Sequence, residues 1–218
     1  MKSILLVLLL LSGFSNAWAK CLDSKLLSRE TNFDNCVIKA GQGDVDAQSY
    51  VGNAYYIQGQ YKQAMLWLQK AAEQGNIYAL VEIGAMYQQG QGVAKNYAQA
   101  AAWYQKAAKR GNVRGQYRLG EMYEEGRGVT QNYAQAVAWY QKSAGQGWKI
   151  AQYRLGFMYG DGRGVTQNYV LAHMWWNIAG AAGYRYAIDE RDGIAKKMTS
   201  VQIQKAQGLA SEWVAKRQ

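Results

Sequence analysis

The chain has 218 residues, 49% of them hydrophobic, and it contains 24 glycines and no proline. Proline breaks helices because it lacks a backbone N–H, so its absence permits long helices. The frequent glycines provide many positions at which helices can end. A formal net charge of +10 makes a polyanionic partner one class to consider, whereas one histidine and two cysteines are too few ligands for a zinc site.

The N-terminal residues, 1–19, have the pattern of a secretory signal peptide. Lys2 precedes an apolar stretch at 4–11, and a small-x-small cleavage pattern ends at Ala19. The apolar stretch is too short to remain as a transmembrane helix. Lys20, rather than a small residue, precedes Cys21, which argues against a lipoprotein anchor. We therefore expect cleavage after Ala19 and a soluble exported protein, periplasmic or secreted.

Both cysteines lie in the segment 20–43, which precedes the repeats described below. A close pair of cysteines in an exported protein is typical of a disulfide formed in an oxidising compartment, so we expect Cys21 to pair with Cys36. Closing so short a loop would stabilise the chain by ~3 kcal/mol. No histidine lies near either cysteine in the sequence, which disfavours a catalytic thiol.

Internal repeats dominate the remaining sequence. Residues 76–111, 112–147 and 148–183 form three copies of a 36-residue unit without a gap. The copy before them, 44–75, lacks four residues from its middle, and a degenerate copy with a capping helix occupies 184–218. A period of this length is typical of stacked helix pairs.

Each copy is predicted to form two helices. In the copy 76–111, Ala79, Ile83 and Tyr87 lie at i, i+4 and i+8 on one helical face, and residues 100–107 carry a second apolar stripe. One glycine recurs within every first helix. Because glycine is costly inside a helix, we expect the backbone of a partner to approach closely at Gly52, Gly84, Gly120 and Gly156.

Capping residues mark the ends of the second helices. Before each helix stands an asparagine that can accept from the free N–H groups of the first turn, at Asn96, Asn132 and Asn168. After each helix stands a glycine, where a left-handed residue is needed, at Gly75, Gly111, Gly147 and Gly183. In the last copy, Thr199 and Gln202 form a T-x-x-Q start signal for the capping helix.

The sequence GRGVTQN joins the two helices in two of the copies, at 126–132 and 162–168. A glycine-rich basic loop could cradle a phosphate, but a phosphate-binding loop leads from a strand into a helix and continues with a Lys-Ser or Lys-Thr pair. We interpret the segment as a structural turn. Its glycines supply positive φ, its valine fills the core and its asparagine caps the next helix.

The recurring pattern A-x3-LG-x-MY-x2-G-x-GV-x3-Y-x2-A-x2-W-x3-AA-x2-G resembles the Sel-one-like repeat (SLR), a relative of the tetratricopeptide repeat with a longer loop. The resemblance covers residues 44–183 closely and the degenerate copy loosely. It implies an all-α fold, a right-handed α-solenoid of antiparallel helix pairs stacked into a superhelix with a concave groove. Stacking is also a physical requirement, because a single helix pair cannot bury both of its apolar stripes.

The resemblance to tetratricopeptide repeats also implies which side chains line the groove. They lie on the first helices and bring four acids together with aromatic rings, a composition typical of a binding hot spot. An alternative is that the tyrosines pack between repeats and the acids are only hydrated. The implied groove residues are Tyr78, Arg114, Tyr117, Glu121, Glu124, Glu125, Tyr153, Phe157 and Asp161.

No arrangement of residues predicts catalysis. His173 has no nucleophile or orienting carboxylate in a recognisable motif, and we expect it to be a packed helix residue. We therefore predict a non-enzymatic scaffold, without cofactor or metal, whose groove binds a protein or peptide partner in the bacterial cell envelope.

The sequence contains no basic tract interleaved with aromatic residues, so it does not indicate a nucleic-acid partner. Anionic lipids or envelope polymers are candidates for a weaker contact with the positive charge.

Two alternatives follow from relatives of the family. Some exported members that resemble this chain are immunity proteins, which neutralise secreted antibacterial effectors in the periplasm. Cysteine-rich relatives are associated with penicillin binding and β-lactamase activity, but they carry a disulfide in each repeat, and this chain has no cysteine inside any repeat. The enzymatic alternative is therefore the weaker of the two.

Overall fold

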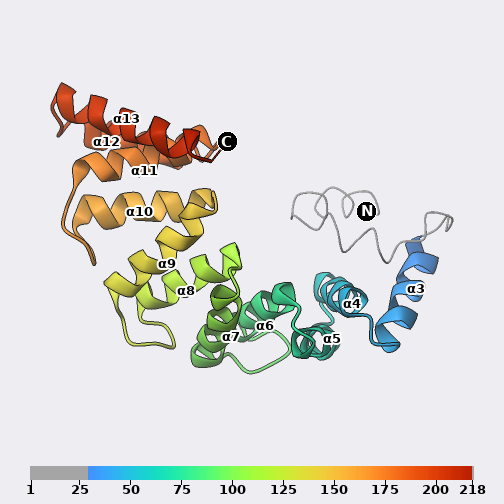
Figure 1. Cartoon of the computed structure of the whole chain (residues 1–218). Helices are drawn as coiled ribbons and strands as arrows, with labels where there is room; N and C mark the ends of the chain where they lie inside the picture. Colours follow the sequence, from blue (N-terminus) through green and yellow to red (C-terminus); the bar gives the residue numbers. More distant parts are fainter. Residues whose placement is uncertain (1–28, 218) are drawn as a thin grey trace. The chain divides into compact units, whose positions relative to one another are not determined.

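The computed structural model describes residues 29–217, and within them the chain forms eleven α-helices and no strand (Figure 1). The predicted all-α class is thereby confirmed. None of these helices is long and apolar enough to cross a membrane. The helices are α3 (Arg29–Gly41), α4 (Val45–Ile57), α5 (Tyr61–Glu73), α6 (Ile77–Gln89), α7 (Tyr97–Lys109), α8 (Val113–Glu125), α9 (Tyr133–Gly145), α10 (Lys149–Asp161), α11 (Tyr169–Ala181), α12 (Tyr186–Ala195) and α13 (Ser200–Ala215).

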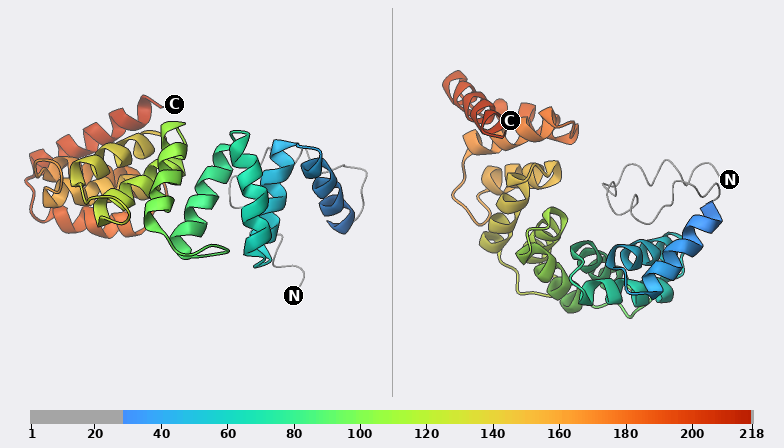
Figure 2. Two further views of the ribbon diagram at one scale, coloured as in Figure 1. Left: turned by 90° about the horizontal axis from the view of Figure 1, so that it is seen from below. Right: turned by 45° about the vertical axis from the view of Figure 1, so that its right-hand side comes forward.

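The chain divides into two compact units, unit 1 up to Asn96 and unit 2 from Tyr97 onward. In unit 1, α3 packs on α4, α4 on α5 and α5 on α6. In unit 2, each helix from α7 to α11 packs on the next, and α12 and α13 both pack on α11. Figure 2 shows these neighbours side by side within each unit. Within each unit, consecutive helices therefore bury one another's apolar stripes, as predicted.

Two of the predictions fall outside the described residues. One is the signal peptide at 1–19, and the other is the position of Cys21. Cys36 is fully buried on α3, in a cluster with Ala40, Ala47 and Val51. The pairing of the two cysteines therefore stays a prediction.

Caps define the helix ends much as predicted. The side chains of Asn132 and Asn168 accept the backbone N–H groups of Gln135 and Leu171 at 2.9 and 3.0 Å. The same type of cap, which was not predicted, begins three of the first helices at Asp44, Asn76 and Asn112. The predicted left-handed glycines that follow the second helices have φ between 81° and 89°, at Gly75, Gly111, Gly147 and Gly183.

The glycines inside the first helices make room for a side chain. A Cβ atom at Gly120 would lie 2.6 Å from the ring of Tyr140, and one at Gly52 would lie 2.8 Å from Leu68 Cγ. At Gly156 the corresponding neighbour is the indole of Trp176. The predicted approach of a partner backbone occurs at Gly52, where Leu68 N would lie 3.1 Å from an added Cβ, but it was wrong at Gly120 and Gly156, where the nearest atoms all belong to side chains. Instead, a large residue of the second helix in the same copy occupies the space that the missing side chain leaves.

The GRGVTQN segment is a joint between successive copies. Its first glycine ends the first helix with a left-handed backbone, as at Gly126 with φ of 68°. Its second glycine, Gly128, has φ of 73° and lies against the backbone of Tyr97, the first residue of the second helix in the preceding copy. Gly164 lies in the same way against Tyr133. The predicted roles of the glycines and of the capping asparagine are therefore confirmed, whereas the loop valines Val129 and Val165 are only partly buried. Any side chain at these second glycines would overlap the preceding copy.

The C-terminal helix α13 covers α11 where a further helix pair would otherwise stack. The predicted start signal forms a capping box, in which Gln202 N–H donates to Thr199 Oγ1 at 3.3 Å and Thr199 N–H donates to Gln202 Oε1 at 2.8 Å. Ala206 is fully buried, and the ring of Trp213 packs edge-on against Trp175 with centroids 5.7 Å apart. This helix therefore serves as the expected cap of unit 2.

Buried glutamines link helix pairs within each unit, a feature that the sequence analysis missed. Gln116 on α8 donates to the carbonyl of Ala108 at 3.4 Å, and its own Oε1 accepts from Gln146 Nε2 at 2.8 Å. In unit 1, Gln48 accepts from Gln74 Nε2 at 2.8 Å in the same way. The second glutamine thereby satisfies the buried amide oxygen of the first.

The copy formed by residues 148–183 lacks the second glutamine of this pair. Gln152 donates to the carbonyl of Ala144 at 3.3 Å, but its Oε1 is buried without a hydrogen-bond partner. The position that corresponds to Gln146, 36 residues further on, is Ala182. Both positions are the C-cap of their helix and have similar backbone angles. A glutamine at 182 could therefore reach the unpaired oxygen.

We predict that Ala182→Gln raises the free energy of unfolding by about 1 kcal/mol, because it supplies the missing donor to a buried acceptor. Chemical denaturation measures the change. Ala182→Glu is the matched control, since an ionised carboxylate of nearly the same size has no donor to offer. Equal effects of the two substitutions would contradict the assignment.

Candidate partner-binding site

The predicted groove residues fall in both units. Tyr78 lies on α6 of unit 1, where its hydroxyl donates to Asn53 Oδ1 at 3.2 Å. The other eight lie on two helices of unit 2. Those on α8 are Arg114, Tyr117, Glu121, Glu124 and Glu125, and those on α10 are Tyr153, Phe157 and Asp161.

Glu121 is held by its own helix. The hydroxyl of Tyr117 donates to Glu121 Oε1 at 2.5 Å, and Arg118 pairs with Glu121 Oε2 at 2.8 Å. Tyr117 is only 6% exposed. Burial, together with the neighbouring Glu121 carboxylate, raises the pKa of Tyr117 well above its ordinary value, so the tyrosine is a permanent donor to this acid.

Glu124 is the more deeply placed acid. Its side chain is 10% exposed, and its Oε2 accepts from the hydroxyl of the fully buried Tyr140 on α9 at 2.6 Å. Arg163, from the loop after α10, pairs with Glu124 Oε1 at 3.4 Å. Burial and the Glu124 carboxylate raise the pKa of Tyr140, which keeps its proton on the hydroxyl. Glu124 therefore joins α8 to α9 and to the next copy.

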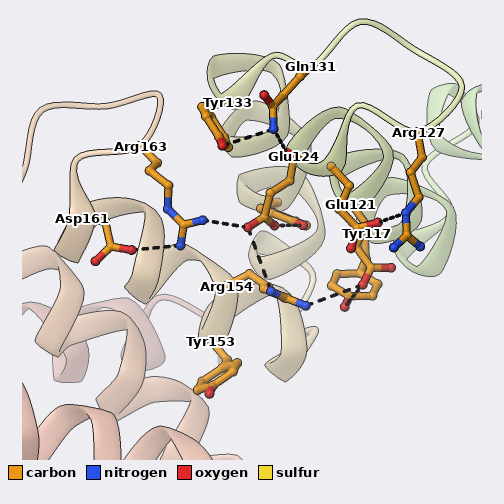
Figure 3. A network of polar contacts seen from close by, with 12 residues as sticks. Tyr117, Glu121, Glu124, Arg127, Gln131, Tyr133, Tyr153, Arg154, Asp161 and Arg163 are labelled. Atoms are coloured by element: carbon orange, nitrogen blue, oxygen red, sulfur yellow. Dashed lines mark hydrogen bonds and ion pairs between the residues drawn. The ribbon is translucent and has the colours of Figure 1, made fainter.

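Arg154 of α10 lies between the two acids (Figure 3). Its terminal nitrogens are 4.0 Å from Glu121 and 4.0 Å from Glu124, which is ion-pair distance but longer than a hydrogen bond. Burial tends to lower the pKa of Arg154, but the Glu124 carboxylate and the hydroxyl groups of Tyr117 and Tyr140 together outweigh that effect and raise it. The guanidinium therefore stays charged while part of its donor capacity is left open.

The exposed charges of this cluster are its arginines. We call it the α8–α10 network. The side chains of Glu121 and Glu124 are 16% and 10% exposed, whereas those of the three arginines are 36–37% exposed. The predicted gathering of acids is present, but two of the four acids are covered by cations. The members of the network are Tyr117, Arg118, Glu121, Glu124, Tyr140, Arg154 and Arg163.

The remaining two acids are exposed and paired. Glu125 contacts Arg127 at 3.0 Å, and Asp161 contacts Arg163 at 2.9 Å. None of the arginines that pair with the four acids was predicted as a site residue, among them Arg118 and Arg154 beside Glu121. A signal was present, since the repeated YRLG places Arg118 and Arg154 at equivalent positions on α8 and α10.

Aromatic side chains continue this surface from α10 towards α12. The ring of Tyr153 lies 4.9 Å from that of Phe157 and 4.9 Å from that of Tyr184, measured between centroids. Phe157 packs edge-on against Trp176, and Tyr184 against Tyr186. We call these five residues the aromatic cluster. Tyr186, which the sequence analysis missed, is its most open member, with 68% of its surface exposed.

His173 is a packed residue of α11, as predicted. It is 3% exposed, and its Nδ1 has no hydrogen-bond partner. Burial, and next the positive charge of Arg191, lower the pKa of His173. Among the described residues there is no group of three or more histidines, cysteines or acids that could hold a metal ion.

Comparisons with known proteins agree on one family. The family model named Sel1 repeat matches residues 45–76, 77–112, 113–148 and 149–184. Among solved structures, c5321, a protective antigen present in uropathogenic Escherichia coli strains and displaying an SLR fold, is 34% identical with a TM-score of 0.75. That match covers 83% of this chain and 39% of c5321, so this chain spans well under half of its length.

A second similar structure is a Sel1 repeat protein from Oxalobacter formigenes. It is 29% identical with a TM-score of 0.67, and the match covers 73% of this chain and 67% of that protein. Among curated proteins none matches this chain.

We predict that Glu124→Gln lowers the free energy of unfolding by about 2 kcal/mol, because two partly buried arginines lose their shared counter-charge. Urea denaturation measures the loss. The adjacent Glu125→Gln is the control, and because its ion pair is exposed it should cost less than about 0.5 kcal/mol. If both substitutions lower the free energy of unfolding by similar amounts, the buried ion pairs of Glu124 stabilise the fold no more than an exposed pair does.

His173 provides a test through pH. Because burial favours its neutral form, the unfolded chain takes up this proton first, so stability should fall as pH drops below about 6.5, the ordinary pKa of histidine. The Hε1 signal of this histidine, the one histidine in the sequence, should give a folded-state pKa below that value in a proton NMR titration. His173→Gln should flatten the decline in the free energy of unfolding. A folded-state pKa at or above the ordinary value would refute the assignment.

Proposed function

The chain belongs to the Sel1 repeat family, and we propose that it binds a protein partner through the face of unit 2 formed by the α8–α10 network and the aromatic cluster. The Sel1 repeat fold commonly mediates protein–protein interaction. The observation that carries the proposal is the placement of Arg154, which is charged and part-exposed and lies between the buried Glu124 and the partly buried Glu121. The aromatic cluster begins at the preceding residue of the chain, Tyr153.

This combination is typical of protein interfaces for physical reasons. Arginine and aromatic side chains are enriched at the centres of interfaces, because they contribute large contact areas together with directional donors. A side chain that is already held in place also loses less conformational entropy when a partner binds. The acids of the network would hold Arg154 in this way before any partner arrives.

We further propose that the partner is met outside the cytoplasm, in the cell envelope. The support for this is the signal-peptide pattern of residues 1–19, with cleavage after Ala19. Within this proposal the chain acts as a scaffold and not as an enzyme. The polar residues that the fold gathers on unit 2 form ion pairs and a binding surface, and they do not include a paired nucleophile and base.

Site-specific photo-crosslinking tests this function in the cell that produces the protein. A benzoylphenylalanine in place of Tyr186, which is 68% exposed, should yield a discrete adduct with another protein. The same probe in place of Val201, which is 73% exposed on α13, is the control and should not yield that adduct. If both sites give the same adducts, or Tyr186 gives none, this face does not bind a protein partner.

A further inference from the structure

The net charge of the protein resides in unit 2. Residues 97–218 contain 17 lysines and arginines against 8 aspartates and glutamates, so they carry +9 of the total of +10. The remaining residues, 1–96, are close to balance, with 8 basic against 7 acidic side chains. A partner of unit 2 therefore approaches a strongly positive body, which favours an acidic one.

The α8–α10 network presents the same sign of charge to a partner. Its two carboxylates point inward and are held by tyrosine hydroxyls, while its three arginines are each more than one third exposed. At Arg118 and Arg154 an incoming group thus meets a guanidinium first, whereas Arg163 is shared with the exposed Asp161. The acids behind them neutralise part of the field but stay out of reach.

Arg154 has donors to spare for such a group. Its contacts to Glu121 and Glu124 are both 4.0 Å long, so neither carboxylate takes a short hydrogen bond from it, and the hydroxyl of Tyr117 occupies only part of the remaining capacity. A guanidinium carries five N–H donors in a planar fork that matches a carboxylate. A ligand carboxylate could therefore bind to Arg154 without displacing the acids that position it.

The aromatic cluster begins one residue before this donor on α10. Tyr153 is the neighbour of Arg154 in the sequence, and ring contacts lead from it through Tyr184 to the exposed Tyr186. Ile188, on the same helix as Tyr186, is also exposed. These side chains can receive an apolar group of the ligand.

We propose that this face of unit 2 recognises an acidic peptide segment, with a carboxylate of the segment on Arg154 and an adjacent aromatic or aliphatic side chain on Tyr153 and Tyr186. The proposal rests on the proposed function and adds to it the chemistry of the partner. An anionic membrane surface would also be drawn to the charge of unit 2, but it would not depend on one positioned arginine with rings beside it.

Fluorescence anisotropy with synthetic peptides tests the proposal on the full-length protein. The probe is a fluorescein-labelled, glutamate-rich peptide that contains two phenylalanines. One comparison peptide has glutamine in place of every glutamate, and another has serine in place of both phenylalanines. The first peptide should bind more tightly than either comparison peptide, and each substitution in the peptide isolates one half of the proposed recognition.

Variants of the protein then locate the contact. Arg154→Gln should weaken binding of the glutamate-rich peptide about tenfold, the effect expected from losing a hydrogen bond between two charged groups. Arg154→Lys keeps the charge but lacks the fork, and it should give a smaller loss. Lys205→Gln removes one exposed charge from α13 of the same unit and should change the affinity less than about twofold.

Several outcomes would overturn the inference. Equal affinity for the glutamate and glutamine peptides would show that this face does not recognise acidic side chains. Equal losses of peptide affinity in Arg154→Gln and Lys205→Gln would show that Arg154 has no specific role in binding. Binding to phosphatidylglycerol vesicles that exceeds peptide binding and is unchanged in Arg154→Gln would assign the charge to a membrane surface. If the adduct at Tyr186 still forms in any of these cases, the proposed function stands and only the partner's chemistry is wrong.

Discussion

A carboxylate that is buried between helix pairs loses its hydration and is stable only where hydrogen bonds and cations replace the lost water. Glu124 receives these replacements from Tyr140 of α9 and from Arg154 and Arg163, which belong to the next copy. The site depends on this one group because it holds α8, α9 and α10 to a single arrangement. The position of the Arg154 guanidinium follows from it.

The repeated loops fix how neighbouring helix pairs pack on one another. The differences between the copies explain why only one copy carries an acid at the position of Glu124. The second glycine of each loop lies against the preceding copy, so the register between neighbouring helix pairs is fixed. Gly160 stands on α10 in the place that Glu124 occupies on α8, so the next copy has no equivalent acid. Shared residues thus build the scaffold, and residues that differ between copies build the surface.

The sequence predicted the fold well because helix pairs are specified locally, by apolar stripes, capping asparagines and left-handed glycines. The site was predicted only in part. The positions of Tyr117, Glu121 and Glu124 were identified, but their partners lie up to 39 residues away, and spacing within one helix does not show which side chains meet across copies. For the same reason the glycine pattern predicted a partner backbone at Gly120, where the structure has the ring of Tyr140.

The central claim is that buried acids position Arg154 for an acidic ligand. Its most direct test is the affinity of the glutamate-rich peptide for Glu124→Gln, measured at a temperature where both proteins are fully folded. Removing a negative charge would strengthen the attraction of an acidic peptide if only the overall field mattered. Our account predicts weaker binding, because Arg154 loses one of the two carboxylates that hold it. Tighter binding by the variant would contradict the account.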